Sequence, residues 1–324
     1  MLENLRLSFL IVFPFLAYMT IGFLLRKFRV VEDEFTARLN RFLAGVLLPV
    51  NIFNSLYDKD LSSAFKNPTA LYCGAGVLLL TLVLIWLVPK WEKDPAKQGA
   101  MIHCGFRGNC MLYALPIAQG IFGRDVPEVV IVLAVVVLIN NFEAVPILEH
   151  YRNKTPKYAA SETSSRLSFK EMVLGWLKTP LLMGVLLGTL WALLRIPMPA
   201  FCGKVISGMA GTVIPLAFMT LGARLNFGHL KANKKNVIRM SLIKLVAAPA
   251  VMLLLPLLAR WPEESVVAVM VGLGAPSAVI CYAMTELYEC DADTAGEIVS
   301  LSSALSMITI FLWIFGLKQM GFIH

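Results

Sequence analysis

The chain has 324 residues, of which 58% are hydrophobic and only 15% are charged, and its mean hydropathy is +0.72. Soluble globular domains carry about 25% charged residues, so this composition excludes an ordinary soluble domain. The formal net charge of +8 does not indicate a nucleic-acid-binding protein, because the lysines and arginines lie in short loops between apolar runs.

Apolar runs long enough to cross a bilayer recur along the whole chain and predict an all-α integral membrane protein. The first run is too long for a signal peptide, and it is followed directly by Arg26 and Lys27 rather than by a small-residue cleavage site. We expect ten transmembrane helices, at residues 5–25, 36–56, 69–89, 97–122, 127–148, 172–194, 200–223, 236–258, 264–288 and 294–317.

The fourth and ninth of these spans contain residues that weaken a helix. The fourth holds Arg107, Gly108 and Asn109 together, and then Pro116, while the run Gly272–Ser277 (Gly-Leu-Gly-Ala-Pro-Ser) interrupts the ninth. Non-helical backbone at membrane depth is stable only beside protein or a water-filled cavity. The two breaks therefore predict crossover helices that meet at a binding site near the bilayer midplane.

The two halves of the chain repeat several glycine and proline positions at an almost constant spacing. The pairs are Pro14 with Pro180, Gly22 with Gly188 and Pro49 with Pro215 at a shift of 166, and Gly105 with Gly272 and Asn109 with Pro276 at a shift of 167. Each half has five spans, an odd number, so the second half is inverted relative to the first. We expect two inverted five-helix repeats, at 1–149 and 171–324, joined by a cytoplasmic linker at 150–170.

The distribution of positive charge predicts the orientation in the membrane. The loops after spans 1, 3, 5 and 7 hold eighteen lysines and arginines, whereas the opposite side holds eight. The positive-inside rule places the richer side in the cytoplasm. We therefore expect a multi-pass protein of the cytoplasmic (inner) membrane with both termini outside.

Three stretches carry a resemblance to a known family. Residues 109–116 (Asn-Cys-Met-Leu-Tyr-Ala-Leu-Pro), with Phe122 and Gly123 following, form one pattern in the fourth span. Residues 47–53 (Leu-Leu-Pro-Val-Asn-Ile-Phe) and 215–225 (Pro-Leu-Ala-Phe-Met-Thr-Leu-Gly-Ala-Arg-Leu) form the others. These resemble the signatures of the auxin efflux carrier family, within the bile-acid, arsenite and riboflavin transporter-like superfamily, and the resemblance covers essentially the whole chain.

The resemblance implies secondary active transport of a small organic anion, by an elevator-type movement of the domain that contains the crossover helices, and it implies a homodimer. The chain length resembles that of the compact prokaryotic members, which are similar to malate and malonate permeases. The third span, residues 69–88, has no acidic or basic side chain, whereas the plant carriers have an acid and a lysine there. A malate- or malonate-like mono- or dicarboxylate is therefore favoured over an auxin-like substrate.

Polar side chains near the breaks are the candidate substrate ligands. Asn109 offers an amide donor to a carboxylate beside a half-helix N-terminus, or it is a structural amide that satisfies backbone freed by Pro116. Arg107 suits bidentate carboxylate binding, or it reaches outward or pairs with Glu143. The asparagines can instead form interhelical hydrogen bonds, and the serine can bond back to its own helix. The candidate set is Asn109, Pro116, Arg107, Asn51, Asn141, Pro276 and Ser277.

Glu143, Glu286 and His103 are the candidates for a coupling proton relay, because ionisable groups inside a membrane are typical of such relays. Glu286 lies close to the end of its span and can simply be solvated, and His103 can be a packing residue. Lys244, in the eighth span, is expected to extend to the cytoplasmic interface rather than to balance substrate charge.

Several chemistries have no motif in the sequence. It contains no GxxxxGK[ST] loop, no HExxH and no metal-spaced Cys/His set, so we expect no enzyme activity, no metal and no cofactor. The six cysteines are expected to be reduced and buried.

The energy would then come from an H+ or Na+ gradient or from substrate exchange. The expected partners are the organic anion, a coupling ion, membrane lipid and a second copy of the chain, with no nucleic acid. A passive channel or facilitator, and a membrane sensor that binds a ligand without moving it, remain open as alternatives.

Overall fold

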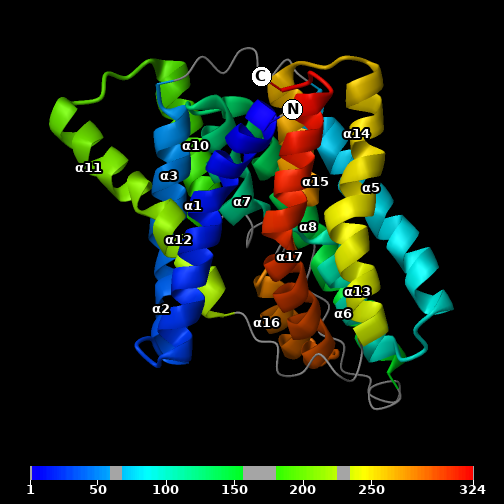
Figure 1. Ribbon diagram of the computed structural model, residues 1–324. Helices are drawn as coiled ribbons and strands as arrows, with labels where there is room; N and C mark the ends of the chain where they lie inside the picture. Colours follow the sequence, from blue (N-terminus) through cyan, green and yellow to red (C-terminus); the bar gives the residue numbers. More distant parts are fainter. Residues whose placement is uncertain (1, 59–67, 156–179, 225–233, 324) are drawn as a thin grey trace.

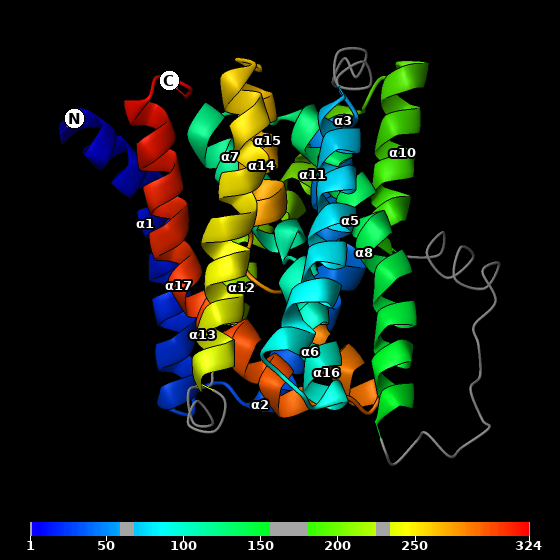
Figure 2. The ribbon, with the colours of Figure 1, turned by 90° about the vertical axis from the view of Figure 1, so that its right-hand side faces the viewer.

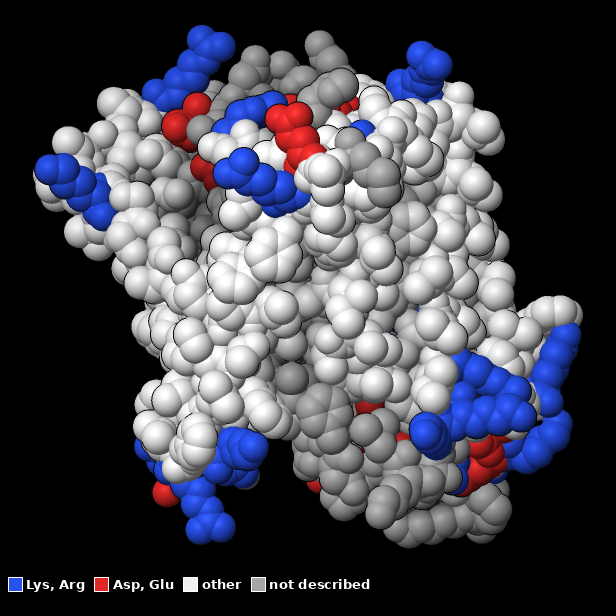
Figure 3. All heavy atoms as spheres, in the orientation of Figure 1, with Lys and Arg blue, Asp and Glu red and all other residues white. Residues whose placement is uncertain are grey.

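The computed structural model describes residues 2–58, 68–155, 180–224 and 234–323, and every element in these ranges is helical apart from one isolated β-bridge. Charged side chains gather at the two ends of the molecule, with a broad uncharged belt between them on the face in Figure 3. The fold is therefore that of an all-α integral membrane protein. The described segments long and apolar enough to cross a membrane are Leu2–Lys27, Thr69–Lys90, Pro127–Lys154, Ala200–Ala223, Lys234–Leu258 and Ala292–Gln319.

The first half of the chain contains the helices up to residue 154. They are α1 (Leu2–Lys27), α2 (Asp33–Phe42), η1 (Leu43–Leu47), α3 (Leu48–Leu56), α5 (Thr69–Leu87), η2 (Val88–Lys90), α6 (Pro95–Phe106), α7 (Cys110–Phe122) and α8 (Pro127–Lys154). Each of the first five expected spans coincides with one of these helices or with a consecutive series of them. The fourth span is divided into α6 and α7, as its sequence predicts.

The second half contains the remaining described helices. They are α10 (Pro180–Leu194), α11 (Ala200–Gly211), α12 (Val213–Ala223), α13 (Lys234–Leu242), η3 (Ile243–Ala247), α14 (Ala248–Leu258), α15 (Glu263–Gly274), α16 (Ile280–Leu287) and α17 (Ala292–Gln319). The ninth span is divided into α15 and α16. The start of the sixth expected span, 172–179, lies outside the described residues, as does most of the expected linker, of which 150–154 belong to α8.

Two of the prolines within the spans, Pro49 and Pro249, follow a π-helical turn. Before Pro49, the Leu48 N–H bonds to the Leu43 carbonyl in the π-helical turn η1, one residue further back than in an α-helix. The turn η3 precedes Pro249 in the same way. Because proline has no N–H and crowds the preceding turn, a wider turn lets the helix continue through it.

The helices form two lobes (Figure 1). The first lobe contains α1, α2, α3, α10, α11 and α12, and the second contains α5 to α8 and α13 to α17. In the first lobe, α1 packs on α12 and α10 packs on α3. A Cβ atom at Gly22 would overlap the backbone of Met219, so glycine is what allows α1 and α12 to approach this closely.

All six cysteines are free thiols, and five of them are buried. Cys290 lies between α16 and α17, where its thiol donates to the Leu148 carbonyl at 3.7 Å. Burial raises the pKa of this thiol to about 12. The side chain therefore behaves as a small apolar group rather than as a nucleophile.

Candidate functional site

The two broken spans cross each other inside the second lobe. Helix α6 stops and α7 starts around Gly108, while α15 stops and α16 starts around Ser277, and these two residues form an antiparallel β-bridge. The Asn109 N–H donates to the Pro276 carbonyl at 2.6 Å, and a second backbone bond of 3.0 Å joins the segments on the other side of the bridge. Each break therefore supplies hydrogen-bond partners for some of the backbone groups that the other break leaves without helical partners. Interrupted helices in a membrane require such partners.

The four half-helices give the crossover its electrostatic character. Figures 1 and 2 show α7 and α15 leading from it toward the end of the molecule that holds both termini, and α6 and α16 leading toward the other end. The N-termini of α7 and α16, which favour anions, and the C-termini of α6 and α15, which favour cations, all point to the crossover.

Lys244 is a crossover residue, and the expectation that it extends to the interface is wrong. It comes from the π-helical turn η3, and only 1% of it is exposed. Its ammonium donates to the Phe106 carbonyl at the end of α6, at 2.9 Å. Nearby, a Cβ atom at Gly108 would lie 3.1 Å from Nζ of Lys244, so a residue with no side chain leaves room for the ammonium. The cation neutralises the carbonyl end of a half-helix, which is why it is stable at this depth.

Arg107 lies between α6 and α7 and turns toward α8. Its guanidinium donates to the side-chain oxygen of Asn141 at 2.6 Å and to the Asn140 carbonyl at 3.4 Å. It does not pair with Glu143, whose carboxylate instead accepts a 2.8 Å bond from the Thr81 hydroxyl. The structure thus brings together two of the predicted ligands, Arg107 and Asn141, and the second holds the first in position.

Asn109 lies at the start of α7 and is 8% exposed. Its side-chain Nδ2 is buried, and it has no hydrogen-bond partner among the described residues. Buried amide donors are almost always paired, so an unpaired one needs an explanation. The alternative in which this amide satisfies backbone freed by Pro116 is not realised, because that use would give Nδ2 a carbonyl partner.

Pro276 and Ser277 belong to the crossover, but their polar groups are already paired. The Ser277 hydroxyl donates to the Cys104 carbonyl on α6 at 2.7 Å, and its N–H donates to the Ser302 hydroxyl on α17 at 3.2 Å. The serine bonds to the other broken span rather than back to its own. Its position therefore indicates that it holds the two breaks together.

Pro116 and Asn51 lie away from the breaks. Pro116 is buried inside α7, which continues past it to Phe122, so the helix is broken at residues 107–109 and not at this proline. Asn51 is buried on α3 in the first lobe, and no hydrogen bond in the described part of the chain joins its side chain to the crossover.

The three predicted relay residues have different surroundings. His103 is fully buried on α6 beside the Phe106 ring, and neither of its ring nitrogens has a hydrogen-bond partner within the described ranges. Glu143 is half-buried between α5 and α8, and Glu286 is exposed near the end of α16. Among the described residues, no three His, Cys, Asp or Glu side chains are grouped to hold a metal ion.

The crossover is electropositive. The hydrogen bonds of Arg107 and Lys244 go to neutral acceptors, and neither cation forms an ion pair with a carboxylate in the described part of the chain. Lys244 is not among the ligands predicted from the sequence. A lysine in the middle of an apolar span, five residues before Pro249, is nevertheless a sequence signal of a functional residue. An electropositive site with a buried amide donor is suited to a small anion.

Comparison with known proteins shows the family to which the chain belongs. A family model described as "Membrane transport protein" matches residues 8–314. An uncharacterized transporter of Methanothermobacter thermautotrophicus is 22% identical over 305 residues, which cover 92% of this chain and 94% of that protein. An uncharacterized transporter of Methanocaldococcus jannaschii is 23% identical over 303 residues, which cover 90% of this chain and 93% of that protein. Since the family match spans nearly the whole chain and confirms the resemblance, the chain belongs to the membrane transport protein family that includes the auxin efflux carriers.

Proposed function

We propose that the protein is a secondary active transporter of a small organic anion in the cytoplasmic membrane. The observation that carries this proposal is the crossover, which holds two cations and the amide donor of Asn109. Within the described residues, neither cation has a carboxylate partner and the amide donor has no hydrogen-bond partner. A mono- or dicarboxylate is the substrate class that such donors suit, with a malate- or malonate-like molecule favoured over an auxin-like one.

We also propose the inverted-repeat architecture, with repeats at 1–149 and 171–324. Gly22 on α1 packs against Met219 on α12, and Gly188 on α10 packs against Phe53 on α3, where an added Cβ atom would lie 3.2 Å from Cα of Phe53. Residues 188 and 219 lie 166 positions after residues 22 and 53, so Gly188 is the counterpart of Gly22 and Met219 is the counterpart of Phe53. Two equivalent helix contacts related by one shift support the repeat in three dimensions, beyond the spacing of prolines.

The division into two lobes supports an elevator-type movement of the second lobe against the first. The crossover lies wholly in the second lobe, so a bound substrate would move with it. Part of the interface is apolar, as where the Phe218 ring of α12 meets the Tyr113 ring of α7 with centroids 5.1 Å apart. Apolar surfaces can slide without breaking hydrogen bonds, as a shear movement requires.

The remaining features of the proposal rest on the sequence. Both termini lie outside the cell, the 150–170 linker is cytoplasmic, and two copies of the chain form a homodimer. Coupling is to H+ or Na+, with Glu143, Glu286 and His103 as the candidate proton carriers.

Uptake into proteoliposomes tests the function. Purified protein would be supplied with radiolabelled malate, malonate or indole-3-acetate, with and without a pH or Na+ gradient. We expect saturable uptake with counterflow, and we expect Asn109→Ala to lower it at least about tenfold by removing a donor to the carboxylate. Asn153→Ala, at an exposed position near the end of α8, is the matched control and should transport normally.

The other outcomes select among the alternatives. Flux that does not saturate and shows no counterflow would identify a channel or facilitator. Binding of an anion without flux would identify a sensor. Full uptake by Asn109→Ala would show that Asn109 is a packing residue and not a substrate ligand.

A further inference from the structure

A coupling cation in a membrane transporter needs oxygen ligands near the substrate. The C-termini of half-helices supply them, because the last carbonyls of a broken helix have no N–H partners within that helix. Here α6 ends at Phe106 and α15 ends at Gly274, and both ends point to the crossover. A coupling cation is therefore expected at one of these two carbonyl ends.

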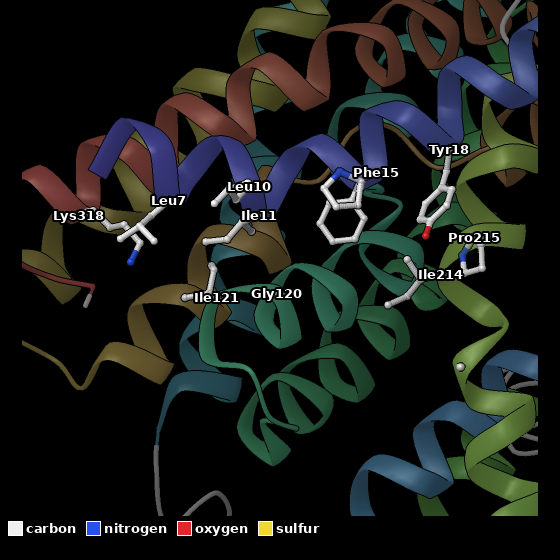
Figure 4. Close-up of a pocket in the computed structure, with 12 residues that line it drawn as sticks. Leu7, Leu10, Ile11, Phe15, Tyr18, Gly120, Ile121, Ile214, Pro215 and Lys318 are labelled. Carbon is white, nitrogen blue, oxygen red and sulfur yellow. The ribbon is translucent and has the colours of Figure 1, made fainter. Parts of the chain in front are cut away.

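The cavity along α1 does not offer such a position. Its volume is about 650 Å³, and Figure 4 shows Leu10, Ile11 and Phe15 in a row on its α1 side. The polar side chains among its described lining residues are those of Tyr18 and Lys318, so none of these residues carries a carboxylate. A metal cation would lose its hydration there without gaining an anionic ligand.

The C-terminal end of α6 already holds a positively charged group. The Lys244 ammonium donates to the Phe106 carbonyl at 2.9 Å, and only 1% of this lysine is exposed. A Cβ atom at Gly108 would lie 3.1 Å from Nζ of Lys244 and 3.5 Å from the carbonyl oxygen of Ala275, the residue that caps α15. The ammonium therefore binds the end of α6 and lies close to the end of α15.

An ammonium and a Na+ ion cannot share this position. Lys244 carries the same single positive charge as Na+, and its attachment to η3 keeps it beside the carbonyl without recruitment from solution. Its electrostatic neighbours are the thiols of Cys104, Cys110 and Cys281, and no carboxylate in the described ranges pairs with it. Nothing there would offset the repulsion between two cations in a medium of low dielectric constant.

We propose that the Lys244 ammonium stands in for a coupling Na+ at the end of α6, so that transport of the anion is independent of Na+. This inference rests on the proposed function and narrows its coupling ion. The positive charge that Na+ would bring beside the substrate is part of the chain and moves with the second lobe. The driving force is then a proton gradient or substrate exchange.

Thermal unfolding of the purified full-length protein in detergent tests the inference without any transport measurement. NaCl would be compared with choline chloride at equal ionic strength, so that only the cation differs. We expect the wild-type protein to unfold at the same temperature in both salts. Lys244→Ala leaves the Phe106 carbonyl and the space beside Gly108 unoccupied, so it should bind Na+ and unfold several degrees higher in NaCl.

Two variants separate Na+ binding from a general effect of salt. Lys244→Met removes the charge but keeps the space filled, so NaCl should not stabilise it. Lys204→Ala, at an exposed lysine on α11, should behave like the wild-type protein. In proteoliposomes, malate uptake by the wild-type protein should be equal in the two salts, and uptake by Lys244→Ala should rise several-fold in NaCl.

Stabilisation of the wild-type protein by NaCl, or wild-type uptake that requires Na+, would overturn the inference and make Glu143, beside Thr81, the next candidate for the cation site. These two measurements do not depend on the folding of any variant. A folded Lys244→Ala that gains nothing from NaCl would also overturn it, because the end of α6 would then not be a cation site. The absence of uptake with every anion would contradict the proposed function, whereas the unfolding comparison tests Lys244 separately.

Discussion

At the scale of single residues, the crossover is distinguished by two buried, positively charged side chains. Lys244 and Arg107 bring two positive charges into the second lobe, and each is stabilised by carbonyl or amide oxygens instead of a carboxylate. Charged side chains at the centre of a membrane helix cost about 2.5–3.5 kcal/mol on insertion scales. We therefore propose that the two cations serve binding of the substrate anion rather than stability of the fold.

Lys244→Met distinguishes these two roles. It removes one hydrogen bond to the Phe106 carbonyl and also the cost of burying a charge, so the midpoint of thermal unfolding should stay the same or rise. Uptake of the organic anion should fall at least about tenfold. The measurements are thermal unfolding in detergent and uptake into proteoliposomes, beside Lys204→Met. A clear loss of stability would show that the lysine is structural.

Asn141→Asp tests whether the charge of Arg107 is available to the substrate. The new carboxylate would lie at hydrogen-bond distance from the guanidinium, where Asn141 now accepts at 2.6 Å, and would neutralise it as an ion pair. We expect the KM for the anion to rise about tenfold with little change in unfolding temperature. Asn153→Asp, at an exposed position of the same helix, should leave KM unchanged. An unchanged KM in Asn141→Asp would exclude Arg107 as a substrate ligand.

At the scale of helices, glycines decide how closely α1 and α12 pack. Gly22 faces the backbone of Met219, and Gly222 faces the backbone of Met19, so neither contact can yield by a side-chain rotation. Close glycine contacts of this kind are a main source of helix association in membranes. The first lobe is therefore expected to be rigid, as the proposed elevator-type movement requires of its stationary part.

Gly22→Val should destabilise the protein by about 1–3 kcal/mol, the usual cost of overpacking, and lower the unfolding temperature by several degrees. Gly208→Val is the matched control, because an added Cβ atom there meets nothing within 4 Å on the exposed side of α11. The two variants would be compared by fluorescence-monitored thermal unfolding. Equal stability of the two would contradict the close packing of α1 on α12.

At the scale of the whole molecule, two hydrogen bonds between the lobes lie toward one end. Ser55 on α3 bonds to Asp125 before α8 at 3.3 Å, and Asn4 on α1 bonds to the Lys318 carbonyl at 3.3 Å. Both contacts lie toward the end that holds the two termini (Figure 1). The structure therefore has the lobes joined by hydrogen bonds at this end.

Crosslinking the lobes at this end should stop transport if the second lobe moves. In Ser55→Cys/Asp125→Cys, oxidation by copper phenanthroline should reduce uptake to background, and dithiothreitol should restore it. The native thiols interfere little, because five of the six are buried. Each single cysteine variant is a control and should be insensitive to the oxidant. Full uptake by the crosslinked double variant would show that transport needs no movement between Ser55 and Asp125.

Much of this architecture can be predicted from the order of residues in the chain. The apolar runs, the prolines and glycines of the fourth and ninth spans, and the candidates Arg107, Asn109 and Asn141 are visible in the sequence, because hydropathy and helix breaking are local properties. A proline within a span suggests a break in the helix, but α7 continues through Pro116. The interface position predicted for Lys244 is wrong because sequence position alone does not show whether a long side chain turns outward or inward.

The sequence by itself determined that the chain is an all-α membrane protein with two interrupted spans, since both follow from the composition and order of neighbouring residues. Only the tertiary structure decided which polar groups meet. It placed Lys244 on the end of α6, joined Arg107 to Asn141, and left Nδ2 of Asn109 without a hydrogen-bond partner among the described residues. These partners are distant in the chain, and a buried polar group is satisfied by whatever packing brings beside it, which no local pattern records.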